Sequence, residues 1–118
     1  MNILFIADPL DGFKIHKDST FAMMRECQRR GLRVHVTEVD ALSWRRGEAV
    51  GATCRELRLT GQPEAWYEVL GESRQPLHTF DAVLMRKDPP FDSEYFYATH
   101  LLSQAEREGA KVFNRASA

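Results

Sequence analysis

The apolar positions change their period several times along the chain, and each change suggests a new element. Residues 2–7 form an almost unbroken apolar run. A run without alternation is typical of a strand that is covered on both faces, as in a parallel sheet. Pro9 ends this strand, since proline favours an extended conformation in the residue before it. Asp8 is therefore expected at the carboxyl end of the first strand.

The next pattern predicts a helix over residues 18–30. Asp18 or Ser19 can accept hydrogen bonds from the unpaired amides at its start, and Gly31 suits the position after its end. The predicted buried face is marked by apolar spacing: Phe21, Met24 and either Cys27 or Gln28. The amino end, with Lys17 beside it, would favour an anionic ligand. Capping alone would equally explain Asp18 and Ser19.

Residues 32–37 alternate between apolar and polar, which predicts a strand with one wetter face, near a sheet edge. His35 is expected to face outward from it. Together with the elements before it, this strand predicts a right-handed parallel βαβ unit.

Residues 40–76 suggest a small antiparallel excursion with a turn at residues 46–47. Positions 50, 52 and 54 are apolar in alternation, but positions 57 and 59 resume out of phase, which predicts a bulge or bend. Residues 61–63 and 71–76 resemble strand breakers. Residues 66–70 fit a short strand or a helical turn equally well. Trp44 and Trp66 are expected to be packing anchors.

Residues 82–85 form the next predicted buried strand, and residues 111–114 the last one. Between them, Asp92 or Ser93 would cap a helix that runs to Glu108 and stops at Gly109. Phe91 and Phe96 occupy the positions of a hydrophobic staple. The apolar stripe of this helix recurs at helical spacing: Tyr95, Ala98, Leu102 and Ala105. The predicted fold class is α/β, a mostly parallel Rossmann-like sheet flanked by helices, with a small antiparallel insert.

The segment between this strand and helix carries the most unusual chemistry. Residues 85–92 read Met-Arg-Lys-Asp-Pro-Pro-Phe-Asp, and the two prolines stiffen the loop that holds Arg86, Lys87, Asp88 and Asp92. Ligands of open α/β sheets bind beyond the carboxyl ends of the strands. A solvated turn with a surface ion pair is the alternative interpretation.

Asp8 and Asp18 are expected at the same edge of the sheet as this segment. No Ser-His-Asp or Cys-His set and no paired metal ligands are visible. The residues therefore predict a half-site for binding, without catalytic residues.

The composition of the chain argues against several classes of function. The 118 residues suit one domain, and the net charge of −1 argues against a general nucleic-acid binder. No apolar run reaches the length of a membrane span, and the first residues enter a strand without the features of a signal peptide. Cys27 and Cys54 lack metal-ligand spacing and are expected to be buried thiols.

Several segments together resemble the bacterial glutathione synthetases. They are Asp8-Pro9, residues 17–23 (Lys-Asp-Ser-Thr-Phe-Ala-Met), residues 28–31 (Gln-Arg-Arg-Gly), residues 84–92 with their Arg-Lys-Asp-Pro-Pro-Phe-Asp run, and residues 112–114 (Val-Phe-Asn). The resemblance covers essentially the whole chain, with a looser middle third.

The resemblance implies an ATP-dependent ligase of the ATP-grasp superfamily. Such enzymes join γ-glutamylcysteine to glycine through an acyl phosphate, in the cytoplasm, as homo-oligomers that are tetramers in this family. Residues 1–118 correspond to the amino-terminal, pre-ATP-grasp domain. This domain holds no cofactor, while ATP and Mg²⁺ bind to later domains, and the chain alone should be inactive. Whether it is an excised domain or a naturally short product stays open.

Within such an enzyme, Arg86 would grip a carboxylate of the peptide substrate, because a guanidinium can hold a carboxylate by two hydrogen bonds. Asp88 and Asp92 would orient Arg86 and Lys87 or meet the substrate's amino group, and Ser19 with Asp18 would receive another anionic end. Two alternatives remain: a non-catalytic assembly module, or a sibling ATP-grasp ligase with another amino-acid substrate.

Overall fold

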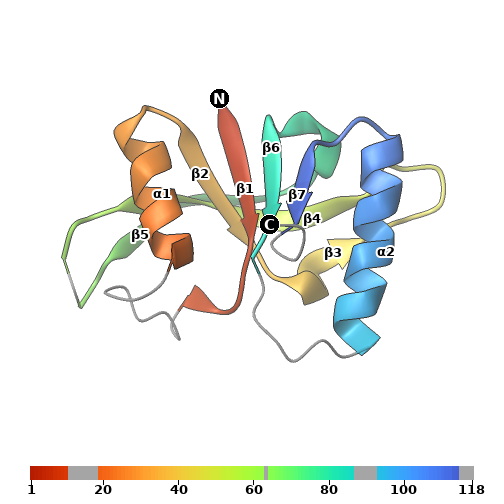
Figure 1. Ribbon diagram of the computed structural model, residues 1–118, viewed down its shortest axis with the longest axis horizontal. Coiled ribbons are helices and arrows are strands. Elements are labelled where there is room, and N and C mark those ends of the chain that lie inside the picture. The colour runs from red at the N-terminus through yellow and green to blue at the C-terminus, as the bar shows by residue number, and fades with distance from the viewer. Residues whose placement is uncertain (11–18, 63, 87–92, 115–118) are drawn as a thin grey trace.

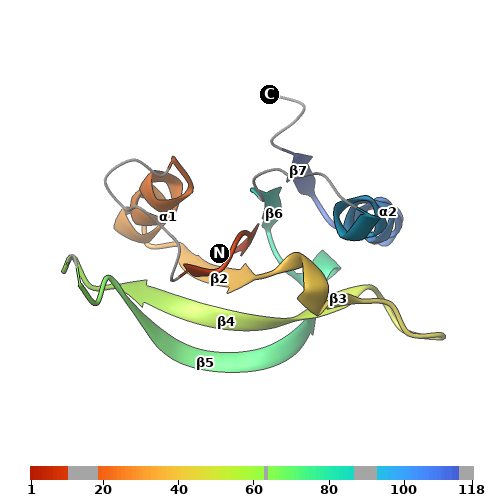
Figure 2. The same ribbon diagram turned by 90° about the horizontal axis from the view of Figure 1, so that it is seen from below.

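The computed structural model describes residues 1–10, 19–62, 64–86 and 93–114. The chain forms a seven-stranded sheet with one helix on each face (Figures 1 and 2). The helices are α1 (Ser19–Arg29) and α2 (Ser93–Arg107). The strands are β1 (Asn2–Ile6), β2 (Arg33–Thr37), β3 (Leu42–Ser43), β4 (Gly51–Leu59), β5 (Tyr67–Pro76), β6 (Ala82–Met85) and β7 (Val112–Asn114). Short 3₁₀ turns, η2 (Val39–Ala41) and η3 (Leu77–Thr79), precede β3 and β6.

The sheet has a parallel part and an antiparallel part. Strands β2, β1, β6 and β7 are neighbours in that order and run parallel. The antiparallel strand β4 pairs with β2 and β3 through different segments and carries β5 on its other side. The predicted α/β class is confirmed, and the insert contributes the two longest strands, of 9 and 10 residues.

Alternate residues of β1 face two different hydrophobic clusters. Ile3 and Phe5 belong to the cluster under α1, which includes Met24. Leu4 and Ile6 belong to the cluster under α2, which includes Leu101. The unbroken apolar run at the start of the chain is therefore explained by burial on both faces, as predicted.

Both helices end in the same hydrogen-bonded motif. The amide of Gly31 donates to the carbonyl of Gln28, and the amide of Leu32 donates to that of Cys27, each at 3.0 Å. Gly31 has a φ of 81° and Gly109, which ends α2 in the same way, has 105°. These are the αL positions that glycine occupies without a steric penalty, so both predicted helix stops are confirmed.

The predicted strand at residues 32–37 is confirmed as β2, but the predictions of a position near a sheet edge and of a wetter face were wrong. It lies inside the sheet, between β1 and β4, and His35 and Thr37 are as buried as the apolar residues that alternate with them. The His35 ring packs edge-on against Phe80, with centroids 5.1 Å apart, and its Nε2 lies 3.1 Å from Asn2 Oδ1. The antiparallel strand β4 covers the side that the alternation had suggested to be near an edge.

The structure of the antiparallel hairpin decides three further predictions, those for residues 66–70, for residues 71–76 and for the two tryptophans. Residues 67–70 begin β5, which settles the open alternative for residues 66–70 in favour of a strand. The expected break at residues 71–76 was wrong, because these residues continue β5; an exposed edge strand tolerates Gly, Ser and a terminal Pro. Trp66 is buried, as predicted for a packing anchor, but Trp44 is 47% exposed.

The predicted irregularity near position 56 is confirmed. The register between β4 and β5 shifts at Glu56/Leu57, where Leu70 is the additional residue on β5. The change of phase within β4 has a second cause: Val50, Ala52 and Cys54 join the cluster under α2, whereas Leu57 and Leu59 join the cluster under α1. One strand therefore serves both cores, with a different face in each half.

In α2, the predicted apolar residues Ala98, Leu102 and Ala105 are buried, and Leu101 joins them. Phe96 is 63% exposed, while Phe91 and the side chain of Tyr95 lie outside what the structure describes. None of the helices in the described ranges has the length and apolar character that a membrane span requires.

Candidate functional site

The site is built where β1 and β6 end side by side. These strands are parallel neighbours, with Ile6 opposite Met85, and the amide of Arg86 donates to the Ile6 carbonyl at 2.8 Å. After β1 the chain returns through α1 on one face of the sheet, and after β6 through α2 on the other (Figure 2). This divergence is the topological switch point, where open α/β sheets bind their ligands.

The side chain of Arg86 links this point to the start of α1. Its Nη2 donates to Ser19 Oγ at 2.8 Å, and its Nε donates to Thr20 Oγ1 at 3.3 Å. Ser19 is exposed, whereas Thr20 is only 5% exposed. A strand end and a helix start that are 66 residues apart in sequence are thus joined by one guanidinium.

The charges at this point favour an anionic group. Helix α1 begins at the carboxyl edge of the sheet (Figure 1), and a helix amino end carries a partial positive charge. Arg86 adds a full positive charge beside it. Carboxylates and phosphates are both anions that a guanidinium and backbone amides bind well.

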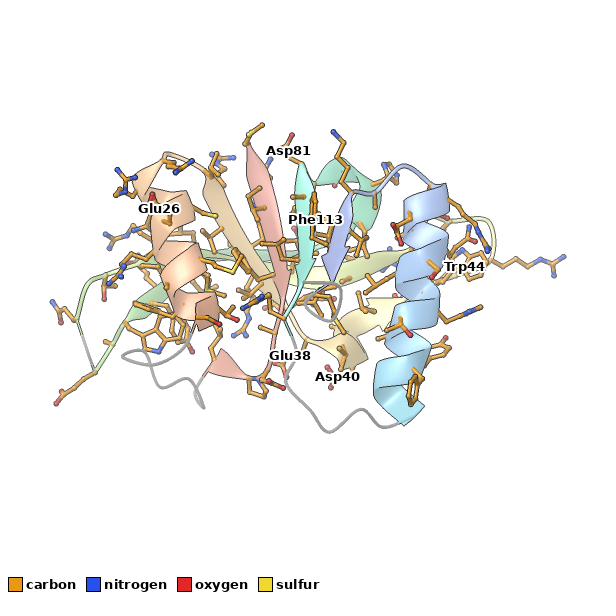
Figure 3. The ribbon with its side chains drawn as sticks, in the orientation of Figure 1. Glu26, Glu38, Asp40, Trp44, Asp81 and Phe113 are labelled. Atoms are coloured by element: carbon orange, nitrogen blue, oxygen red, sulfur yellow. The ribbon has the colours of Figure 1, made fainter. Side chains whose placement is uncertain are left out.

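Acidic residues follow the neighbouring strand ends. Asp8 is the second residue after β1, and Glu38 and Asp40 follow β2; Figure 3 shows the latter two at the same lower edge of the sheet. These carboxylates could receive an amino group, so the edge offers complementary charges to a molecule that carries both an amine and a carboxylate.

Of the residues predicted for the site, the structure brings Arg86 and Ser19 into contact and places Asp8 at the same edge. The predictions for Asp18, Lys87, Asp88 and Asp92 fall outside the described residues. Sequence reasoning missed Thr20. The signal was present, because Thr20 lies four positions before the buried Met24 and therefore on the same helix face.

The two thiols are unsuited to nucleophilic chemistry. Burial raises the pKa of Cys54 to about 12, and burial is also the main cause that raises the pKa of Cys27. Both are therefore protonated near neutral pH, and the thiol is far less nucleophilic than the thiolate. The prediction of buried thiols is confirmed for Cys54, whereas Cys27 is only half-buried.

In the described ranges, no three His, Cys, Asp or Glu side chains are grouped so that they could hold a metal ion. The geometry that is present, a cation fixed at a switch point beside a helix start, is that of a ligand-binding α/β domain.

Comparison with known proteins makes this class specific. The family model described as "Prokaryotic glutathione synthetase, N-terminal domain" matches residues 1–118, and the chain belongs to this family. It is 52% identical over 118 residues to a glutathione synthetase of Ralstonia nicotianae, covering 100% of this chain and 36% of the relative. It is 49% identical over 117 residues to that of Nitrosomonas europaea, covering 97% of this chain and 36% of the relative.

A glutathione synthetase of Vibrio parahaemolyticus is 46% identical over 110 residues, covering 93% of this chain and 34% of the relative. The chain thus spans about a third of the length of these curated relatives. The resemblance that the sequence motifs indicated is confirmed at the level of the family.

Proposed function

We propose that this chain is the substrate-side, N-terminal domain of a glutathione synthase, the ligase that joins γ-glutamylcysteine and glycine with ATP hydrolysis through an acyl phosphate. Membership of the family and the names of the relatives support the ligase. The observation that carries the substrate-side role is Arg86, held at the β1/β6 switch point against the start of α1.

In this role the chain binds and orients one substrate. Arg86 receives a carboxylate of γ-glutamylcysteine, with Ser19 beside it, and Asp8 lies where it could meet the substrate's amino group. We assign four further residues to the same substrate-binding surface: Lys87, Asp88, Asp92 and Asp18. Holding both ends of a flexible peptide reduces the freedom that it must lose before reaction, which is the usual contribution of positioning residues.

No residue of this chain is proposed to be catalytic. ATP and Mg²⁺ are assigned to the part of the enzyme that lies outside these 118 residues, where ATP would supply the activated acyl group. The chain alone is expected to be inactive, and the complete enzyme to be a cytoplasmic homo-oligomer.

Ligase activity is tested by measuring ADP release by the complete protein, expressed from the whole reading frame that contains this chain. We expect turnover only when γ-glutamylcysteine and glycine are both present. Turnover with a different pair of amino-acid substrates would indicate a sibling ligase. Absence of ATP cleavage with any pair would reject the proposal.

The experiment for the site is Arg86→Ala in the same protein. Loss of one charged contact should raise the KM for γ-glutamylcysteine by about tenfold or more, with the KM for ATP little changed. Arg74→Ala is a matched control, because Arg74 also donates to a serine hydroxyl, Ser43 Oγ at 2.9 Å, but lies within β5 of the antiparallel hairpin. Equal effects of Arg86→Ala on both KM values would show that Arg86 does not bind the peptide substrate.

An assembly module is the competing function, and one observation favours it. The edge strand β5 exposes Val69 (43%) and Leu70 (51%), apolar residues that a contact between copies would cover. Under that function, Arg86→Ala would change the melting temperature or the oligomeric state and leave substrate saturation unaltered.

A further inference from the structure

The hydroxyl of Thr20 has no assigned role, although it contacts the residue on which the proposed site depends. Thr20 is the second residue of α1 and is 5% exposed. Its Oγ1 lies 3.3 Å from Arg86 Nε and accepts a hydrogen bond from it. Buried hydroxyls are costly unless they are hydrogen-bonded, so this contact accounts for a polar atom on the packed face of the helix.

Two contacts fix a guanidinium better than one. Ser19 accepts from Nη2 and Thr20 from Nε, and these two donors lie along one edge of the planar group. A single hydrogen bond would allow the plane to rotate about that bond. Two acceptors on consecutive residues of a helix prevent this rotation and fix the orientation of the whole guanidinium group.

The two hydroxyls differ in rigidity. Ser19 is exposed at the first helical position, where its side chain can rotate. Thr20 is packed in the interior and β-branched, and both features restrict its χ1 angle. The more rigid of the two acceptors is therefore Thr20.

We propose that Thr20 is a positioning residue, which orients the Arg86 guanidinium for the carboxylate of the peptide substrate. This inference rests on the proposed function, in which Arg86 binds that carboxylate. It adds that the affinity for the peptide depends on a residue in the protein interior, through the geometry of the arginine. A guanidinium free to rotate would hold the carboxylate by one hydrogen bond for part of the time.

The test uses the complete protein and compares Thr20→Val with Thr20→Ser. Valine keeps the shape and removes the hydroxyl, and we expect the KM for γ-glutamylcysteine to rise about tenfold, the effect of one lost hydrogen bond to a charged group. The KM for ATP should stay unchanged. Serine restores the hydroxyl, so its KM values should be close to those of the parent protein. Should the valine variant fail to fold, Thr20→Ala removes the same hydroxyl with a residue that favours helix.

Thr37→Val is the matched structural control. Thr37 is also 5% exposed, and its Oγ1 donates to the Thr53 carbonyl at 2.8 Å within the sheet. This variant should lower the melting temperature and leave both KM values unaltered. An increase in the KM for γ-glutamylcysteine that is as large for Thr37→Val as for Thr20→Val would overturn the proposal.

The double variant Arg86→Ala/Thr20→Val distinguishes the positioning role of Thr20 from the binding role of Arg86. With Arg86 absent, removal of the hydroxyl should raise the KM for the peptide no further. Additive effects, or equal effects of Thr20→Ser and Thr20→Val, would reject the positioning role while Arg86 keeps its own. No effect of Arg86→Ala on the KM for the peptide would reject the proposed site and this inference together.

Discussion

His35 is a buried base whose protonation opposes folding. Its ring packs on Phe80, and within the described part of the chain its Nδ1 is a buried atom without a hydrogen-bond partner. Burial lowers the pKa of His35 below its usual 6.5; Glu56 works against this shift and Arg33 adds to it. The folded protein therefore prefers the neutral ring.

The stability of the isolated chain should consequently fall as the pH drops below about 6.5, where the unfolded chain begins to bind a proton that the native ring resists. The slope cannot exceed about 1.4 kcal/mol per pH unit for one proton. Urea unfolding between pH 7 and pH 5 measures it, and His35→Gln should flatten the curve. Glu26, whose pKa its arginine neighbours lower from 4.5 to about 2, contributes mainly below pH 5, where its carboxyl begins to bind protons in the unfolded chain.

His100→Gln is the control, because His100 is exposed on α2. Its curve should follow that of the parent chain. A curve for His35→Gln that is as steep as that of the parent would show that another group causes the slope.

The error for His35 shows what local pattern can and cannot predict. Alternation in residues 32–37 correctly indicated a strand, but polar residues at alternate positions are also found on faces that another part of the chain covers. The cover comes from β4 and from Phe80, which are remote in sequence. In the same way, its position at a strand end correctly placed Arg86 at the carboxyl edge of the sheet. Its contact with Thr20, however, depends on how α1 packs against the sheet.

At the scale of elements, a side-chain amide fastens α1 to the end of β4. Gln28 Nε2 donates to the Leu59 carbonyl at 3.1 Å, and the Leu59 amide donates to Gln28 Oε1 at 2.7 Å. Both backbone groups of Leu59 are satisfied by this one side chain. Because Leu59 also belongs to the cluster under α1, the amide bonds and the apolar contacts hold the same two elements together.

Gln28→Ala should therefore lower the free energy of unfolding by about 1–3 kcal/mol, because two partly buried backbone groups lose their partners. Chemical denaturation of the isolated chain measures this change. Arg29→Ala on the same helix removes an exposed ion pair with Glu26 and should leave the free energy of unfolding nearly unchanged, because solvent screens such a pair. A loss for Gln28→Ala as small as that for Arg29→Ala would contradict the proposed role of the amide.

Helices and strands could be predicted from the sequence where their residues are uniformly buried, and less well where burial changes along the element. The strand at residues 82–85 and both helix stops were predicted at their observed positions, because apolar runs and αL glycines are local signals. The strand β5 was predicted only in part, since its residues are mostly exposed and give no hydrophobic alternation. Its existence depends on pairing with β4, which the sequence of β5 alone does not encode.

At the scale of the whole molecule, the candidate site depends on strand order more than on any one motif. Arg86 and Asp8 are 78 positions apart, yet β6 and β1 are neighbours and end together. The sequence suggested that strand ends would converge, but it could not show that β1 and β6 form the switch point. That required the order of all four parallel strands and the opposite faces taken by α1 and α2 (Figure 1).

Strand β5 carries two exposed apolar side chains, Val69 and Leu70, at an edge of the sheet. Among the described residues, strand β5 pairs only with β4 and is an edge strand, and its additional residue, Leu70, disturbs the regular ladder that another chain would need for sheet extension. Contact between copies of the complete protein is therefore expected to use the exposed side chains of Val69 and Leu70 more than backbone pairing. Val69→Lys/Leu70→Lys should lower the molar mass in light scattering, because burying two charges in a subunit contact is unfavourable.

Substrate saturation should not change in this double variant, since β5 and the β1/β6 switch point lie at different places in the sheet. Tyr97→Lys is the control, because Tyr97 is 61% exposed on α2 and belongs to another surface. An unchanged mass for Val69→Lys/Leu70→Lys would remove β5 from the contact. A lowered mass together with a raised KM for γ-glutamylcysteine would instead show that assembly and substrate binding are coupled, and that the site needs its neighbouring subunit.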